Sequence, residues 1–133
     1  GHRGGAMGRV GNLRALCTEM VPEWERLLAL SPFPGLTGRL RLRIADPTAP
    51  RGVAQGTLDL VLRRGRVAIL PPTGRTDAVL AADQDKFTRL VLGFHTPAAA
   101  ALLGEVRLTP AAVPLTAVLF PPRTLTIFGP ERF

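Results

Sequence analysis

The amino-acid sequence predicts an α+β fold in which a single, mainly antiparallel sheet of about five strands packs against helices. Three observations support this prediction. Apolar residues recur at helical spacing near the start of the chain, alternate with polar residues in its middle third, and return to helical spacing after residue 83. Separate blocks of helices and strands are typical of domains whose helices gather on one face of a sheet. A chain of 133 residues, 46% of them hydrophobic, is long enough to form one domain with its own core.

The first predicted element is helical. Residues 1–6 resemble a linker or processing remnant, so the domain is expected to span residues 7–133. Asn12 can cap a helix that ends near residues 31–35, where prolines and a glycine follow one another. Pro22 lacks a backbone donor, which predicts a kink or a second helix that opens at Pro22. The apolar residues at helical spacing are Leu13, Leu16, Cys17, Met20, Val21, Trp24, Leu27 and Leu28.

Strands follow in the middle of the chain. Residues 39–44 alternate strictly, so their leucines and isoleucine share one face and their arginines the other. Residues 57–62 and 66–70 flank an Arg-Gly pair and read as a hairpin, and residues 77–82 are a further strand. Asp59 faces outward, where it can pair with an arginine on a neighbouring strand.

The last third of the chain carries helix start and stop signals. Asp83 can cap a helix over residues 84–92 that ends at Gly93. Thr96, followed by Pro97, is the start signal for an alanine-rich helix that continues to residue 103. The Thr-Pro pair at 109–110 predicts a further capped helix over residues 111–120, with a proline tolerated near its first turn.

Composition narrows the chemistry. Cys17 is the single cysteine, so no internal disulfide is possible and a cytoplasmic location is expected. Its apolar neighbours indicate a core thiol, and the two histidines, His2 and His95, offer no metal-ligand spacing and little catalytic potential. No apolar run approaches the roughly 20 residues that span a bilayer. The net charge of +7 comes from dispersed arginines without a dense basic block, which favours a solvated surface over a nucleic-acid partner.

The helical half offers a candidate binding site. The alanines of residues 98–101 permit either close contact between helix and sheet or space for an apolar ligand, and the sequence leaves both readings open. If a cavity forms, the side chains expected to line it are Leu90, Phe94, Ala99, Leu102, Leu103 and Val118.

The C-terminal residues are unusual. Most chains end in polar residues, but this one passes through two prolines, an alternating run and a Gly-Pro pair to end on Phe133. An anchored aromatic ring would hold the terminal carboxylate of Phe133 at a fixed place, where it is a potential ligand or general base. Since the rest of the chain lacks an acid, base or metal cluster, this carboxylate would have to act across an interface.

An ordered series of segments resembles a known family over almost the whole chain, from about residue 7 to 133. The chain is similar to the sterol carrier protein type 2-like domain at the C-terminus of a class of bacterial GNAT N-acetyltransferases. This class includes the enhanced-intracellular-survival aminoglycoside acetyltransferases. The segments that carry the resemblance are residues 8–10, 38–42, 46–47, 56–60, 77–80, 92–96 and 119–123, together with the terminal Phe133.

The resemblance implies an α+β sandwich and a function for the tail. In that class the C-terminal carboxylate reaches the adjoining catalytic domain and serves as general base, and Phe133 is the matching position here. The family often carries Trp and Asp before the final Phe, whereas this chain has Glu131 and Arg132, and Arg132 can pair with the carboxylate and lower its basicity. No acetyl-CoA pyrophosphate loop is found, so acetyl-CoA and the reaction would belong to a GNAT domain in the same chain or another.

Two functions therefore rank closely. The first is an accessory C-terminal domain of an N-acetyltransferase, which helps to form the acceptor site and is not an enzyme in isolation. The alternative is a stand-alone sterol or lipid carrier module that holds an apolar ligand between sheet and helices. A homo-oligomer formed through an exposed strand edge is a further expectation, although the arginines of residues 39–43 guard that edge.

Overall fold

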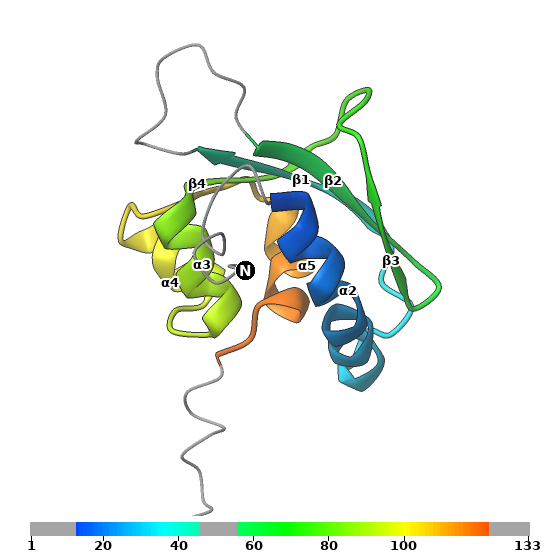
Figure 1. The fold of residues 1–133 in the computed structure, drawn as a ribbon. Coiled ribbons are helices and arrows are strands. Elements are labelled where there is room, and N and C mark those ends of the chain that lie inside the picture. The colour runs from blue at the N-terminus through cyan, green and yellow to red at the C-terminus, as the bar shows by residue number, and fades with distance from the viewer. Residues whose placement is uncertain (1–12, 46–55, 123–133) are drawn as a thin grey trace, which may run out of the picture.

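A computed structural model describes residues 13–45 and 56–122 of the protein and shows a sheet with helices on one face (Figure 1). The sheet is five-stranded with the order β3-β2-β1-β4-β5. All neighbouring strands are antiparallel except β1 and β4, which run parallel. The predicted α+β class and mainly antiparallel sheet are confirmed. The strand bounds are β1 Gly38–Ala45, β2 Gly56–Arg63, β3 Arg66–Leu70, β4 Ala78–Asp83 and β5 Arg107–Leu108.

In the part of the chain that the structure describes, four helices cover the inner face of the sheet (Figure 1). The strands alternate as predicted, so one set of side chains is buried beneath the helices and the other faces away from them. The helix bounds are α2 Leu13–Leu30, α3 Gln84–Leu92, α4 Pro97–Leu102 and α5 Ala112–Leu119. The buried strand residues that form the floor of the core are Leu40, Leu42, Ile44, Leu58, Leu60, Leu62, Val67, Ala78 and Leu80.

Of the two outcomes predicted at Pro22, a kink or a second helix, the second helix is wrong, because α2 is one helix of 18 residues that contains this proline. Pro22 cannot donate a hydrogen bond to the carbonyl of Thr18, four residues earlier. Both residues lie on the exposed side of the helix, so that carbonyl faces water. The buried residues Cys17, Trp24 and Leu28 hold the two halves of the helix against the core on its other side.

The local signals of the hairpin and of α3 and α4 are confirmed. Arg64 and Gly65 both have positive φ, 53° and 78°, which matches the twist of a two-residue hairpin turn. The carboxylate of Asp83 accepts a 2.9 Å hydrogen bond from the amide of Lys86, and Gly93 ends α3 with φ 83°. Thr96 caps α4 as expected.

The predicted cap at Thr109 is wrong. Its hydroxyl donates a 2.6 Å hydrogen bond to the carbonyl of Asp77 and accepts a 2.9 Å bond from the amide of Val79. Thr109 thus fastens the chain after β5 to the start of β4, and α5 begins at Ala112 without a side-chain cap. The strand β5 itself was not predicted, since its two residues are too short for an alternating pattern.

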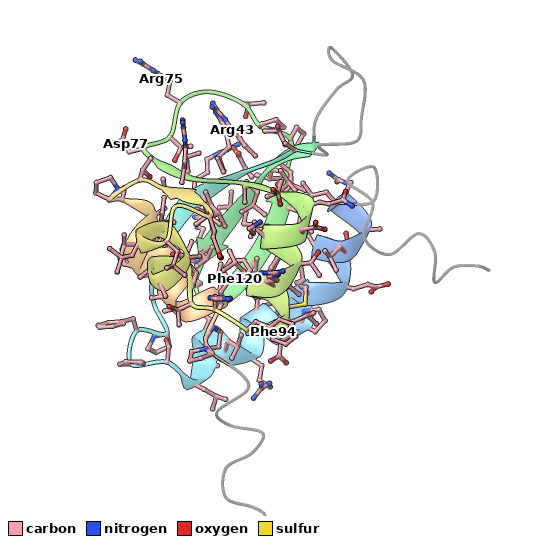
Figure 2. All side chains as sticks on the ribbon, turned by 90° about the vertical axis from the view of Figure 1, so that its left-hand side faces the viewer. Arg43, Arg75, Asp77, Phe94 and Phe120 are labelled. Atoms are coloured by element: carbon pink, nitrogen blue, oxygen red, sulfur yellow. The ribbon has the colours of Figure 1, made fainter. Side chains whose placement is uncertain are left out.

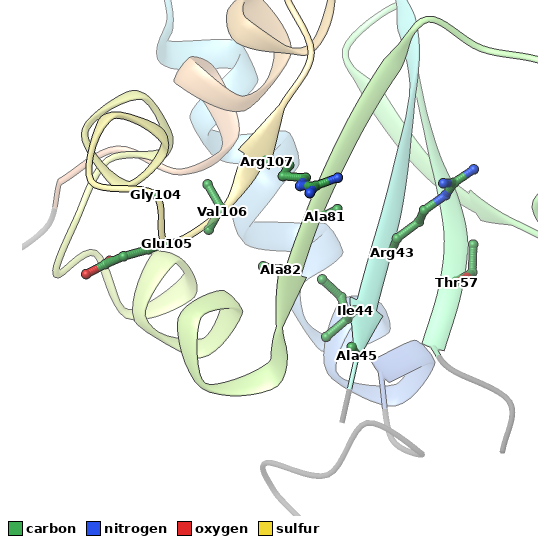
Figure 3. A pocket seen from close by; sticks show the side chains of 10 residues that line it. All are labelled: Arg43, Ile44, Ala45, Thr57, Ala81, Ala82, Gly104, Glu105, Val106 and Arg107. Carbon is green, nitrogen blue, oxygen red and sulfur yellow. The ribbon is translucent and has the colours of Figure 1, made fainter. Parts of the chain in front are cut away.

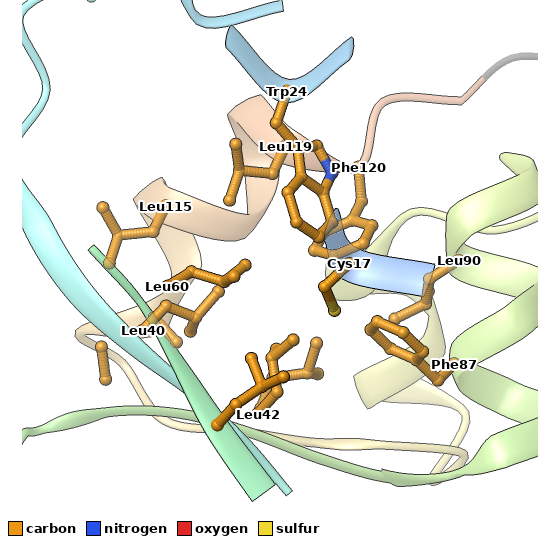
Figure 4. Close-up of a cluster of buried hydrophobic side chains, with 14 of the residues drawn as sticks. Cys17, Trp24, Leu40, Leu42, Leu60, Phe87, Leu90, Leu115, Leu119 and Phe120 are labelled. Atoms are coloured by element: carbon orange, nitrogen blue, oxygen red, sulfur yellow. The ribbon is translucent and has the colours of Figure 1, made fainter. Parts of the chain in front are cut away.

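Three aromatic rings join the helices at the centre of the core (Figure 4). Phe120 lies edge-on to Trp24 at 5.8 Å and to Phe87 at 5.9 Å between ring centroids. These contacts connect α2, α3 and the end of α5. Cys17 is fully buried near the three rings, and burial raises the pKa of its thiol to about 12. The sequence-based prediction of a core thiol is therefore confirmed.

Candidate functional site

The outer face of the sheet is built around one buried carboxylate. Asp59 on β2 lies directly opposite Arg41 on β1 and is fully covered, as the pairing predicted from sequence requires. Its Oδ1 accepts a 2.8 Å hydrogen bond from Nε of Arg41, and its Oδ2 accepts bonds from Nη2 of Arg41 and Nε of Arg39. Burial alone raises the pKa of the Asp59 carboxyl. The hydrogen bonds and charges of Arg41 and Arg39 outweigh that effect and hold the pKa below its ordinary value.

The same two arginines fasten the loop that follows β3. Nη2 of Arg39 donates a 3.0 Å hydrogen bond to the hydroxyl of Thr73, and Nη2 of Arg41 donates to the carbonyls of Thr73 and Gly74 at 2.9 and 3.2 Å. Both guanidinium groups are thus committed to Asp59 and to this loop. The arrangement stabilises the outer face and uses three of the roughly four acceptor positions of the Asp59 carboxylate.

A cleft of about 510 Å³ lies at the carboxyl ends of β1 and β4, beside the turn that leads from α4 to β5 (Figure 3). Strand register places four of its residues in one row across the sheet. Thr57 is opposite Arg43, Arg43 is beside Ala81, and Ala81 is opposite Arg107. The full lining is Arg43, Ile44, Ala45, Thr57, Ala81, Ala82, Gly104, Glu105, Val106 and Arg107.

The electrostatics of this cleft differ from those around Asp59. Neither Arg43 nor Arg107 forms an ion pair within residues 13–45 and 56–122. Glu105 is the acidic residue of the lining, and Figure 3 shows its side chain directed away from both arginines. The cleft therefore combines two exposed cations with a floor of small and apolar side chains. Such a surface can bind an anion that carries an apolar part.

Sequence reasoning missed this cleft. Arg107 lies on the strand that was not predicted, and the parallel pairing of β1 with β4 brings Arg43 and Ala81 together across 38 positions of sequence. The one available signal was Arg43 itself, as an outward arginine of β1 that lies opposite Thr57.

The structure distributes the predicted ligand-binding residues between core and surface. Leu90 is buried in the core at 1% exposure, whereas Phe94, Leu102 and Leu103 are 56%, 89% and 64% exposed. Ala99 is exposed, and Val118 is half-buried. Phe94 precedes α4 and Leu103 ends it, so they lie at opposite ends of that helix. Figure 2 shows Phe94 on the helical side of the molecule, remote from Arg43. The binding role of these residues stays a prediction.

The other sequence-based candidates give no catalytic cluster. Phe133, with its carboxylate, lies outside the described residues, as do Arg132 and the predicted cap Asn12. Within the described ranges no three His, Cys, Asp or Glu side chains gather in a way that could hold a metal ion. None of the described helices is long and apolar enough to cross a membrane.

Comparison with protein families matches residues 24–127 to the Sterol carrier protein domain. Since this match covers most of the chain, the protein belongs to the sterol carrier protein domain family. No curated protein matches the chain.

Solved structures share the fold at low sequence identity. Palmitated SCP2L2 from Aedes aegypti has a TM-score of 0.55 and 13% identity, over 80% of this chain and 93% of that one. A crystal structure of sterol carrier protein 2 has a TM-score of 0.52 and 24% identity, over 85% and 90%. A GCN5-related N-acetyltransferase from Anabaena variabilis has a TM-score of 0.50 and 22% identity. The match covers 65% of this chain and 21% of that enzyme, so the chain spans about a fifth of the enzyme's length.

Proposed function

We propose that this sterol carrier protein domain binds an apolar molecule against its helical layer and performs no chemistry on it. The observation that carries the proposal is the family match over residues 24–127, which includes the C-terminal part of α2 and every later described element. A structure with the same fold from Aedes aegypti is described as palmitated, which supports an acyl chain as a ligand class to test first.

Two features of the helical layer support the same proposal. The indole Nε1 of Trp24 is buried and has no hydrogen-bond partner within the described ranges, so a polar group of an entering ligand can accept from it. The exposed side chains of Phe94, Leu102 and Leu103 offer apolar surface that a ligand would remove from water. Trp24 is fully buried, so a ligand can reach its indole only if elements packed around it move apart.

The single tryptophan of the chain provides the test. A polyene fatty acid such as cis-parinaric acid absorbs where tryptophan emits, so binding near Trp24 should give saturable energy transfer. Palmitate should displace the probe and butyrate should not. The double variant Phe94→Ser/Leu103→Ser should weaken binding, while Leu30→Ser, a change at an equally exposed leucine on α2, should not. Absence of saturable energy transfer would contradict the proposal.

A second candidate is an accessory role beside an N-acetyltransferase catalytic domain, in the same chain or in another. The likeness to an enzyme of which this chain spans about a fifth favours this candidate. Large exposed side chains on the helical layer, such as Leu92 and Leu102, are the kind of surface that a neighbouring domain covers. In this function acetyl-CoA binds the catalytic domain, and the carboxylate of Phe133 serves as general base for the acceptor amine.

The accessory role is tested on the complete gene product by acetyl transfer from acetyl-CoA to a panel of amines. Deletion of Phe133 should lower turnover strongly, whereas Phe133→Leu keeps the terminal carboxylate in place and should retain much of it. Unchanged turnover after the deletion would remove the catalytic role of the tail.

A further inference from the structure

Beyond the apolar ligand, we propose that the cleft at the carboxyl ends of β1 and β4 is a separate site for an organic phosphate, whose phosphate group binds between Arg43 and Arg107. The site lies at the end of the sheet (Figure 3), and its row of Thr57, Arg43, Ala81 and Arg107 belongs to the outer face, away from the helical layer. It therefore differs from the ligand position proposed above and does not depend on it.

The strand register supplies the geometry. Arg43 and Arg107 occupy one row of the sheet with Ala81 between them. Neighbouring strands lie about 4.8 Å apart, so the two arginine Cα atoms are separated by about 10 Å. A guanidinium group reaches more than half that distance from its Cα atom, and the methyl group of Ala81 leaves the space between them open. Thr57 continues the row on the far side of Arg43 and adds a hydroxyl.

Charge distribution separates this row from the rest of the outer face. Arg39 and Arg41 both pair with Asp59, whereas Arg43 and Arg107 have no carboxylate partner in the described part of the chain. The nearby acids do not replace one. Glu105 is directed away from the arginines (Figure 3), and Asp77 lies before the opposite end of β4 (Figure 2). The cleft thus carries two positive charges that the described residues leave uncompensated.

The chemistry of the ligand follows from these groups. A guanidinium fork binds a pair of oxygens, and a phosphate monoester presents three, so it can be shared by two arginines. A carboxylate can also be shared by two arginines, as Asp59 is by Arg39 and Arg41, but it has one oxygen and up to one negative charge fewer than a phosphate monoester. A cleft of about 510 Å³ exceeds what a bare phosphate fills. Among the remaining lining residues, Ala45 is exposed and Ala82 half-buried, so their methyl groups can contact an apolar part of the ester.

The test is a titration of the 133-residue chain with phenyl phosphate, followed by NMR of backbone and arginine Nε–H signals at about pH 7.5, where the phosphate is largely dianionic. We expect saturable shifts confined to the row of Thr57, Arg43, Ala81 and Arg107. The double variant Arg43→Gln/Arg107→Gln should bind phenyl phosphate at least about tenfold more weakly than the parent protein. The matched control is Arg63→Gln/Arg66→Gln, which removes the same charge from the opposite end of the hairpin and should bind as the parent does.

Two further arms identify the source of the phosphate. Vesicles of phosphatidylcholine with phosphatidic acid present the same phosphomonoester on a lipid surface, and vesicles of phosphatidylcholine alone are their control. Arginine-dependent binding of phenyl phosphate without binding of the phosphatidic acid vesicles supports the site with a soluble ester as ligand. Arginine-dependent binding of both supports the site with a lipid head group. Absence of saturable shifts at millimolar phenyl phosphate, or equal weakening in both double variants, would overturn the proposal.

Discussion

Replacement of Asp59 by asparagine tests how the outer face of the sheet is held together. The carboxylate is fully covered and accepts three hydrogen bonds from two guanidinium groups. An asparagine at this position would keep the shape of the side chain but lose the charge. Its amide group would also place a donor opposite one of the arginine donors, so Arg39 and Arg41 would repel each other without compensation.

The expected loss of stability can be worked from these contacts. Removal of one partner from a buried ion pair costs about 3–5 kcal/mol. The side chains of Arg39 and Arg41 are 31% and 12% exposed, so solvent screens part of the repulsion and the loss falls at or somewhat below the lower end of this range. We expect Asp59→Asn to lower the free energy of unfolding by about 2–3 kcal/mol, or the melting temperature by about 10 °C for a chain of this size.

The dependence on pH gives the decisive assay. Because the folded protein holds the pKa of Asp59 below its ordinary value, the ion pairs contribute fully above the unfolded pKa, which is about 3.9. Their contribution is lost as the pH falls through the lower, folded pKa. Urea unfolding from about pH 7 to about pH 2 should therefore show the gap between parent and Asp59→Asn closing in acid. The control Asp77→Asn changes an acid outside these ion pairs and should lie close to the parent throughout. A loss below about 0.5 kcal/mol at neutral pH, or a gap that stays constant into acid, would refute the reasoning.

Three further predictions concern the core and one helix start. Burial raises the pKa of the Cys17 thiol to about 12. A thiol reagent at mildly alkaline pH should therefore label the unfolded protein rapidly and the native protein hardly at all. Rapid labelling of the native protein would contradict the buried position of this thiol. Gly38→Ala should lower stability by about 1–2 kcal/mol in urea unfolding, since its Cβ would lie 3.0 Å from both Cδ atoms of Leu115. Asp83→Ala should lower it by about 1 kcal/mol through loss of the hydrogen bond from Lys86, whereas Asp83→Asn should retain most of that cap.

The predictable part of the fold is the part encoded by neighbouring residues. The bounds of α3 follow from Asp83 and Gly93, and the hairpin turn follows from Gly65, because capping and turn chemistry act over three or four positions. Pro22 shows the limit of such local rules. It weakens α2 only on the water-facing side, and contacts of Trp24 and Leu28 with the distant sheet maintain the helix.

The pairing partners and directions of strands that are distant in the sequence could not be predicted from the residues alone. Nothing in residues 78–83 states that they run parallel to β1, because an alternating strand can pair in either direction. The sequence around Arg107 has no strand pattern, and only the structure shows that this residue lies on β5 opposite Ala81. The pairing of Asp59 with an arginine was predicted, since an outward acid on one strand and outward arginines on another favour that contact. The row from Thr57 to Arg107 could not be predicted in this way, because it depends on the pairing of four strands.

The alternating residues of β1 contribute to both faces of the sheet. Its leucines and isoleucine support the helical layer, while Arg39, Arg41 and Arg43 project from the other side. A shift of one residue in register would exchange the two sets and bury three arginines, so the alternation itself excludes such a slip. Asp59 reinforces that register, because it meets Arg41 directly only when Leu40 is opposite Leu60. The apolar contacts and the ion pairs thus select the same register. That register also places Arg43 opposite Thr57, two residues from Asp59 along β2, and beside Ala81 on β4. Arg43 is left without a carboxylate partner in the described part of the chain.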